Sequence, residues 1–514
     1  MENRSEIFGH PRGLAVLFFT EMWERFSYYG MRGLLVLYLV ADVADGGFGW
    51  SQVEALSLYG TYTMMVYLMS IPGGILADKF IGQKKAVMLG GALLVAGHGI
   101  MALPGETMFY AAITLIVLGV GALKANISTM VGGLYRQGDV RRDKGFTIFY
   151  MGINLGSALS SLIVGYIGQV YGWHWGFGLA GIGMLFGQLQ FIYGQKHLQG
   201  VGDFVKEDKK SKEDGVNHIQ RLIENPSSLV IVALLAAFGA YVLVTTSILF
   251  GILVMIAGIF LGFGINIYRL ELNDIEKDRI VVLLISFLIV IAFWGAFEQA
   301  GGLMNLYTEQ KTDKSVFGLF EMTAAQFQFF NPGFIILLGV PIASFWAARR
   351  IKGKEESAIF KMAVGNMIMG MGFVMMVGAT MEVESAGVAS MWWIVGAYLL
   401  HTIGELCASP VALSFITKLA PVKYGSIMMG LYFAMTGIGN KVAGLLGESA
   451  SEFGEFQVFA GIGIFSVAFG FLLVLFLKKL KKLTHGAEEV VGIDEDDESE
   501  VNDAQVKELE KETV

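Results

Sequence analysis

Cysteine, proline and charged residues are scarce in this sequence. One cysteine, Cys407, among 514 residues excludes an intramolecular disulfide bond and a metal site built from several cysteines. Charged residues make up only 16% of the chain and hydrophobic residues 54%, a balance too apolar for a soluble multidomain protein. Eight prolines stand against 67 glycines, and small residues let membrane helices approach closely. The composition therefore predicts an all-α polytopic membrane protein.

Two further features of the chain ends follow from composition. The first residues lack an apolar core followed by a small-residue cleavage site, so we expect no cleavable signal peptide. The net charge is −8, but residues 488–514 contain twelve Asp or Glu and two Lys, a net of −10, which leaves +2 for the remainder. This acidic stretch has few aromatic residues and no periodicity, and we expect it to be disordered.

The apolar segments predict about fourteen transmembrane helices, each of about 20 residues or more. Six fall near residues 12–40, 52–77, 86–103, 107–134, 145–171 and 173–193, and six more near 279–307, 322–347, 360–380, 388–417, 423–449 and 454–477. Two closely spaced segments, 227–246 and 248–268, lie between these sets. We divide the chain into an N-terminal six-helix bundle (1–193), a cytoplasmic linker with a two-helix insertion (194–278), a C-terminal six-helix bundle (279–482) and an acidic tail (483–514).

The lysines and arginines set the expected orientation. With the N-terminus inside, they gather in cytoplasmic loops and helix flanks: Lys79, Lys84, Lys85, Arg136, Arg141, Arg142, Lys144, Arg349, Arg350, Lys352, Lys354 and the run at 478–482. The opposite loops carry only Lys311 and Lys314. By the positive-inside rule, both termini are expected in the cytoplasm and the protein in the cytoplasmic membrane.

The first apolar segment carries charges where hydrocarbon is expected. Each would cost about 2.5–3.5 kcal/mol at a helix centre unless it faces water or an opposite charge. At about 100° per residue they share an arc of about 140° with two tyrosines. The members of this charged face are Glu21, Glu24, Arg25, Tyr28, Tyr29 and Arg32.

The order of these residues, E-x-x-E-R-F-x-Y-Y-G from Glu21 to Gly30, resembles the first-helix signature of the proton-dependent oligopeptide transporters. This family is a branch of the major facilitator superfamily, whose fold of two six-helix bundles agrees with the helix count. The segment from Gly73 to Lys85, with Asp78, resembles the superfamily's loop motif, which we interpret as a conformational latch. Helix count alone is equally compatible with other transporters of twelve to fourteen helices.

Three further segments place polar residues inside predicted helices. Lys124 lies about 15 Å from the cytoplasmic end of its helix and needs an anionic partner: Glu21, Glu24, Glu405 or a substrate carboxylate. The segment FYMGINLGS, with Tyr150 and Asn154, resembles a second family signature, although a tyrosine and an asparagine one turn apart also suit an interhelical hydrogen bond. The segment GELCASP, with Glu405 and Ser409, resembles a third signature. Similar depths, about 24 Å and 21 Å from the outer ends, let Lys124 and Glu405 meet across the bundle interface.

Arg32 and Glu298 are expected to form a gate pair. From their cytoplasmic starts they lie about 30 Å and 28 Å along the first and seventh helices, in the outer halves of opposing bundles. We therefore predict that their opposite charges close the outer mouth. Lys441, near the outer end of its helix, is expected to snorkel or to pair with Glu448.

The resemblance implies which residues bind the substrate and couple protons. It implies that Arg25 and Lys124 hold a peptide's carboxylate and Glu405 its amino group, and that these residues line the pocket: Tyr29, Tyr67, Tyr150, Asn154, Trp294, Asn331 and Ser409. Tyr432 stands where the family usually has tryptophan, which changes the shape of a side-chain subsite. Proton coupling is assigned to Glu21, Glu24, Arg25, Lys124 and Glu405, without choosing among the carboxylates. His98 and His401 are not assigned to it.

The predicted function is proton-coupled symport of di- and tripeptides into the cell by alternating access. The partners are then peptides, protons and the lipid bilayer, with no cofactor, metal or nucleic acid. The alternative within transporters is a proton-coupled carrier of another small solute, such as nitrate or an amino-acid conjugate. A membrane-embedded enzyme is disfavoured because no nucleophile and base pair, metal-ligand cluster or phosphate loop appears. A receptor would need no balanced set of acids and bases inside its helices.

Overall fold

The computed structural model describes residues 6–136, 139, 141–204, 272–421 and 424–487. The predicted two-helix insertion and the acidic stretch 488–514 lie outside these residues. The described part is almost entirely helical, and nine of its helices are long and apolar enough to cross a membrane. The fold is therefore that of an all-α polytopic membrane protein.

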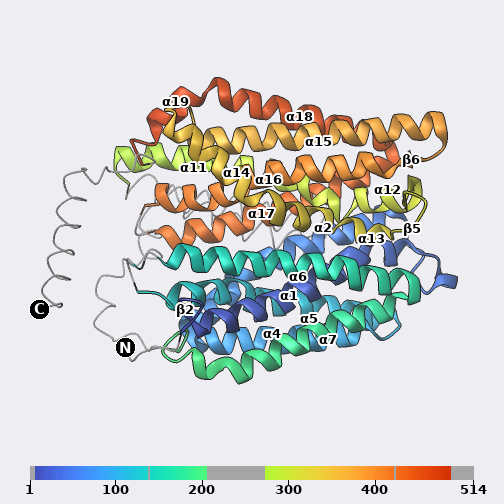
Figure 1. The fold of residues 1–514 in the computed structure, drawn as a ribbon, viewed down its shortest axis with the longest axis horizontal. Coiled ribbons are helices and arrows are strands. Elements are labelled where there is room, and N and C mark those ends of the chain that lie inside the picture. The colour runs from blue at the N-terminus through green and yellow to red at the C-terminus, as the bar shows by residue number, and fades with distance from the viewer. Residues whose placement is uncertain (1–5, 137–138, 140, 205–271, 422–423, 488–514) are drawn as a thin grey trace, which may run out of the picture.

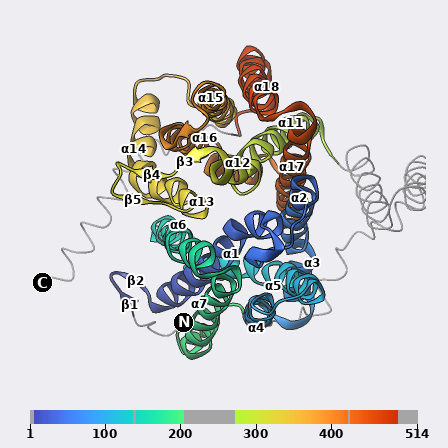
Figure 2. The same cartoon turned by 90° about the vertical axis from the view of Figure 1, so that its right-hand side faces the viewer.

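The N-terminal half forms one bundle (Figures 1 and 2). A short antiparallel hairpin of β1 (Glu6–Ile7) and β2 (His10–Pro11) precedes it. The long helices run in order: α1 (Arg12–Val40), α2 (Gln52–Leu68), α4 (Gln83–Met101), α5 (Glu106–Gly133), α6 (Arg141–Tyr171) and α7 (Trp173–Gly194). Shorter helical segments lie between or after them: η1 (Val43–Asp45), α3 (Ser70–Leu76), η2 (Ala77–Ile81) and η3 (Gln195–His197). The predicted second helix is thus broken near Met69, and α3 continues it.

The C-terminal half forms the second bundle, on the other side in Figure 2. Its long helices are α11 (Asp274–Phe297), α14 (Phe330–Ile351), α15 (Ala358–Ala386), α16 (Met391–Leu419), α17 (Gly425–Phe453) and α18 (Glu455–Leu475). Short helices extend them: η5 (Glu298–Ala300), α12 (Leu303–Lys311), α13 (Ala324–Phe327) and α19 (Leu477–Leu483). Strand β3 (Thr312–Asp313) pairs in parallel with β6 (Ala389–Ser390), and β4 (Ser315–Val316) pairs with β5 (Phe320–Glu321).

Local sequence explains where several of these helices begin. Ser51 and Glu54 form a capping box at the start of α2, and Asn273 and Glu276 form another at the start of α11. In each box two backbone N–H groups that lack helical partners are satisfied by side chains. The side chain of Gln299, just after α11, donates to the carbonyl of Ala443 in α17 at 2.9 Å, which ties the end of this helix to its neighbour.

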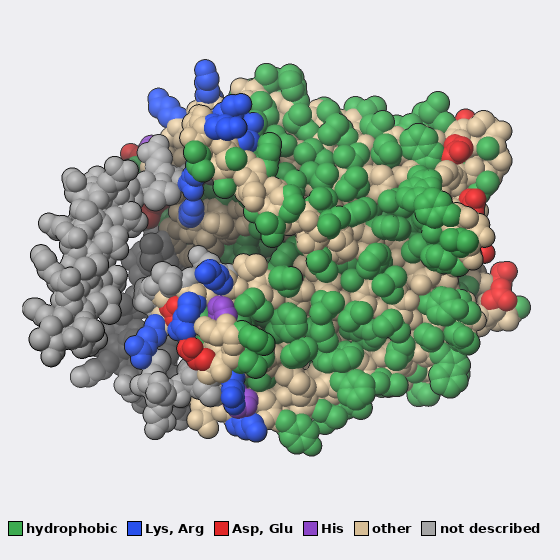
Figure 3. All heavy atoms as spheres, viewed as in Figure 1, with side chains coloured by type: hydrophobic (Ala, Val, Ile, Leu, Met, Phe, Trp, Pro, Cys, Tyr) green, Lys and Arg blue, Asp and Glu red, His purple; other side chains and the backbone are tan. Residues whose placement is uncertain are grey.

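Charge divides the molecule into two ends. Figure 3 shows a broad apolar belt, with lysine and arginine gathered at one end, together with some acidic side chains, and only aspartate and glutamate visible at the other. We call these the basic end and the acidic end. The α5–α6 connection lies at the basic end, where hydrogen bonds from the Arg141 side chain and backbone hold the pKa of Asp139 below its usual range. Both β2 and α19 lie at the basic end (Figure 1).

The two bundles meet along two lateral interfaces (Figure 2). α2 packs against α17 on one side, and α6 packs against α13 and α14 on the other. The α2–α17 contact is unusually close, because a Cβ atom added at Gly444 would lie 2.8 Å from the Cα of Gly60. Such close approach between helices of different bundles requires glycine at both positions.

Candidate functional site

A large cavity lies between the bundles. Its volume is about 3370 Å³, and it extends from residues at the basic end, such as Gln83 and Arg136, to Arg32 and Glu298. Figure 3 shows the corresponding hollow between two groups of basic side chains. All ten residues predicted to bind substrate line it: Arg25, Tyr29, Tyr67, Lys124, Tyr150, Asn154, Trp294, Asn331, Glu405 and Ser409. Helices from both bundles therefore bring these residues to one site.

The charged face of α1 forms an internal ion cluster. Arg25 Nε lies 3.0 Å from Glu21 Oε1 and also forms an ion pair with Glu24 Oε2. Glu21 and Arg25 line the cavity, whereas Glu24 is fully buried behind them. The Arg25 guanidinium also lies over the Tyr28 ring, 5.3 Å from its centroid. Two carboxylates thus share one guanidinium, and neutralising either carboxylate would leave Arg25 with a weaker hold on its own helix.

Lys124 presents its ammonium to the cavity. Its Nζ lies 3.6 Å from the centroid of the Tyr67 ring, a cation–π contact between α5 and α2. Among the described residues, no carboxylate forms an ion pair with Lys124 within 4.0 Å. An ammonium in this setting is suited to an anionic ligand group.

Glu405 is held by its own bundle. Asn331 of α14 donates to Glu405 Oε2 at 2.8 Å and to the Thr402 hydroxyl at 3.1 Å. The expected contact between Lys124 and Glu405 is not made, because the cavity separates the two bundles at this depth. At this depth Arg25 and Lys124, with Glu21, therefore lie on the N-terminal side and Glu405 lies on the C-terminal side, with open space between them.

The second predicted signature contributes to the cavity wall. Asn154 donates to the backbone carbonyl of Tyr150 at 2.9 Å, within α6, and among the described residues its side chain makes no hydrogen bond to another helix. Tyr150 itself is 39% exposed toward the cavity. Trp294, Ser409 and Tyr432 form the opposite aromatic and polar wall.

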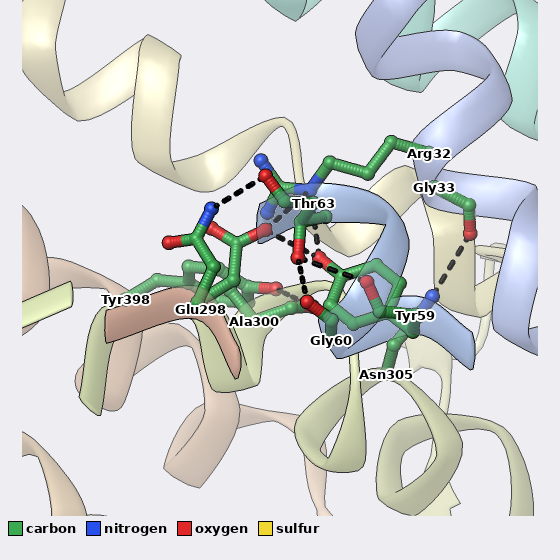
Figure 4. Close-up of polar contacts among 10 residues, drawn as sticks. Arg32, Gly33, Tyr59, Gly60, Thr63, Glu298, Ala300, Asn305 and Tyr398 are labelled. Atoms are coloured by element: carbon green, nitrogen blue, oxygen red, sulfur yellow. Dashed lines mark hydrogen bonds and ion pairs between the residues drawn. The ribbon is translucent and has the colours of Figure 1, made fainter. Parts of the chain in front are cut away.

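The cavity ends at a charged contact between the bundles. Arg32 Nε of α1 lies 3.2 Å from Glu298 Oε1, in the turn that follows α11. Tyr59 of α2 joins the pair: its hydroxyl donates to Glu298 Oε1 at 2.6 Å and accepts from Arg32 Nε at 2.9 Å. Figure 4 shows the three side chains converging. All three are at most 6% exposed. The structure thus brings the predicted gate residues together, although their role as a gate stays a prediction.

Further contacts close the acidic end around this pair. Asn305 of α12 donates to the carbonyl of Gly33 at 2.9 Å, as Figure 4 shows. On the other lateral interface, the Ala325 backbone N–H donates to Gln169 of α6 at 2.8 Å. The described structure is therefore closed at the acidic end and hollow at the basic end.

Sequence reasoning missed Tyr59 and Thr402. The stretch from Ser57 to Thr63, SLYGTYT, is the most polar part of α2, and this was the available signal for Tyr59. Thr402 is one turn before the predicted Glu405, on the same helix. His401, by contrast, packs its ring 4.7 Å from the Phe373 ring in the bundle interior and does not line the cavity.

Comparison with known proteins identifies the family. The model of the POT family matches residues 84–459, well over half of the chain. The chain belongs to the POT family. It is similar to the uncharacterized transporter YclF of Bacillus subtilis (strain 168), with 36% identity over 93% of this chain and 96% of YclF. It is also similar to the peptide transporter YePEPT of Yersinia enterocolitica, with 39% identity over 86% of this chain and 88% of that protein.

Solved structures of POT family members show the same fold. A peptide transporter POT in complex with sulfate superposes with a TM-score of 0.81 and 35% identity, over 93% of this chain and 97% of that one. The fold is therefore the major facilitator fold of the POT family. The relatives are multi-pass membrane transporters and not enzymes.

Proposed function

We propose that this POT family member imports di- and tripeptides together with protons by alternating access. The observation that carries the proposal is the charge arrangement of the cavity. Arg25 and Lys124 lie on the N-terminal side and Glu405 on the C-terminal side, all lining one space. A zwitterionic peptide presents a carboxylate and an ammonium at its two ends, so it would bridge the bundles.

The environment of each end supports this assignment. Lys124 has no carboxylate partner in the described chain, so a substrate carboxylate would supply its missing anion. Glu405 keeps one oxygen for a ligand while Asn331 donates to the other. Tyr29, Tyr67, Tyr150, Trp294, Asn154 and Ser409 would line the space for the peptide backbone and side chains.

The α1 cluster supplies a physical link between protons and substrate. If Glu21 or Glu24 takes a proton, Arg25 loses one of its two partners and becomes available to the substrate carboxylate. Conversely, when the substrate carboxylate draws Arg25 away from Glu21 or Glu24, that glutamate loses its positive partner and binds a proton more readily. Substrate and proton binding therefore reinforce each other. The proton is then the coupling ion, and no other cofactor is required.

Charge distribution supports the proposed location. We place the basic end in the cytoplasm and the protein in the cytoplasmic membrane, following the positive-inside rule. Residues near both termini, in β2 and α19, lie at this end, which favours cytoplasmic termini. In this orientation the hollow faces the cytoplasm and the Arg32–Glu298 contact closes the outer side.

A comparison of two ligands tests the assignment of the peptide's ends. Wild-type protein in proteoliposomes should exchange labelled dialanine, and unlabelled dialanine should compete. N-acetyl-dialanine, which lacks the ammonium group, should compete at least tenfold more weakly, because the loss of one charged contact costs about 1.5–3 kcal/mol. In Glu405→Gln the difference between the two competitors should shrink. Equal competition in wild type would refute the role of Glu405, and competition by nitrate instead would favour the anion carrier.

A further inference from the structure

Lys441 of α17 connects the two bundles near the closed end of the molecule. Its Nζ donates to the backbone carbonyl of Ser57 at 3.2 Å and to the Thr61 hydroxyl at 3.1 Å. Both acceptors are on α2, in the other bundle. Of the two expectations for Lys441, snorkelling to the surface is not seen, because the ammonium bridges the α2–α17 interface, whereas pairing with Glu448 is found at the longer distance of 3.7 Å. The contact lies one turn from Gly444, where that interface is closest.

Glu448, two turns further along α17, makes weaker polar contacts than Lys441 does. Its Oε1 lies 3.7 Å from Lys441 Nζ, which is longer than the 2.7–2.9 Å of a charge-assisted hydrogen bond. Within the described chain this buried oxygen has no hydrogen-bond donor. The side chains are only about a quarter and a fifth exposed, at 25% and 21%. The ammonium is thus drawn toward α2 and away from a carboxylate on its own helix.

We propose that Lys441 is a positioning residue of the outer gate, which exchanges partners during transport. With the outer side closed, its ammonium binds the two oxygens of α2. With the outer side open, α2 and α17 separate, and the ammonium closes onto Glu448, which moves with it. This step rests on the proposed alternating access, and it adds a second charged contact to the one between Arg32 and Glu298.

Partner exchange lowers the free-energy cost of opening the outer side. Separating the bundles would otherwise leave an ammonium without its two acceptors, which disfavours opening. Glu448 offsets that loss, because its donor-free oxygen gains a hydrogen bond at the same moment. Lys441 therefore has partners in both states, two oxygens of α2 in the closed state and Glu448 in the open state, whereas Glu448 acts mainly on the open state.

Cysteine labelling can distinguish the roles of Lys441 and Glu448. Leu56 of α2 is 1% exposed and packs against the position of Gly447 in α17, so Leu56→Cys should react with an impermeant maleimide only when the outer side opens. The native Cys407 is buried and gives little background. We would label the full chain in proteoliposomes, without peptide or gradient, in the Leu56→Cys parent and in variants made on it.

We expect opposite changes in labelling rate. Lys441→Met should be labelled about fivefold faster, because the loss of two partly screened contacts from the closed state outweighs the loss of one solvated ion pair from the open state. Glu448→Gln should be labelled about twofold more slowly, because it removes only the open-state ion pair. The control is Lys311→Met, which breaks an ion pair with Glu455 on the same side but within one bundle, and should leave the rate unchanged.

Each other outcome would overturn the inference. Changes in the same direction for Lys441→Met and Glu448→Gln would mean that the pair only stabilises α17. No change in either, or an equal change in Lys311→Met, would mean that the contacts of Lys441 do not influence opening of the outer side. Because labelling uses no substrate, these results are independent of the transported solute. Dialanine uptake by the Leu56→Cys parent, measured in parallel, tests the proposed function separately.

Discussion

The hydroxyl of Tyr59 should hold the outer gate closed. It donates to Glu298 at 2.6 Å and accepts from Arg32 at 2.9 Å, in a site where all three side chains are buried. The donated bond crosses between the bundles. Tyr59→Phe removes one oxygen and leaves the ring, so it leaves the direct contact between Arg32 and Glu298 in place.

The size of the effect follows from the charges involved. A hydrogen bond to a charged group contributes about 1.5–3 kcal/mol. In the open state water replaces these partners, so the closed state alone loses about 2 kcal/mol, which is about 30-fold in the closed-to-open ratio. In the Leu56→Cys background, Tyr59→Phe should therefore label much faster with an impermeant maleimide.

The matched control for this prediction is Tyr62→Phe. Tyr62 lies on the same helix and is 2% exposed, but its hydroxyl has no hydrogen-bond partner in the described part of the chain. In the Leu56→Cys background, Tyr62→Phe should be labelled at the same rate as the Leu56→Cys parent. If Tyr59→Phe and Tyr62→Phe label alike, the hydroxyl does not hold the gate and the reasoning fails.

Three further predictions address the gate, the coupling and the interface. Arg32→Glu and Glu298→Arg should each abolish dialanine uptake, and the double reversal should restore part of it; no rescue would count against the pair. Glu24→Gln should abolish proton-driven uptake but spare peptide exchange, and acidification with each peptide pulse would disprove its coupling role. Gly444→Val should destabilise the closed state relative to the open state by about 1–3 kcal/mol, because its Cβ would lie 2.8 Å from the Cα of Gly60. An unchanged rate of maleimide labelling of Leu56→Cys would refute this.

Much of this architecture could be predicted because burial in lipid restricts sequence strongly. Charged residues inside apolar segments are costly, so Arg25, Lys124 and Glu405 can be recognised as functional candidates from the sequence alone. Their common lining of one cavity follows from helix periodicity and depth. Arg32 and Glu298 come from the same depth argument, and the structure places them 3.2 Å apart.

Other contacts could not be predicted, because they depend on the conformation and on neutral residues. Whether Lys124 meets Glu405 depends on how far the bundles are separated, which helix depth does not determine. Tyr59 is one of 18 tyrosines, and the polar stretch that contains it also contains Tyr62, so this signal does not distinguish the tyrosine that bridges two charges from one that does not. Lys441 lies near a helix end, where snorkelling is the usual outcome, and only the close approach of Gly60 to Gly444 brings α2 within its reach.

The most direct test of the central claim is gradient-driven uptake in proteoliposomes. With the outside acidic, wild-type protein should accumulate labelled dialanine above its external concentration, a protonophore should abolish this accumulation, and Glu405→Ala should not accumulate it. Uptake that only equilibrates, whatever the gradient, would contradict proton coupling. If wild type takes up no dialanine but accumulates nitrate under the same gradient, the peptide assignment is wrong.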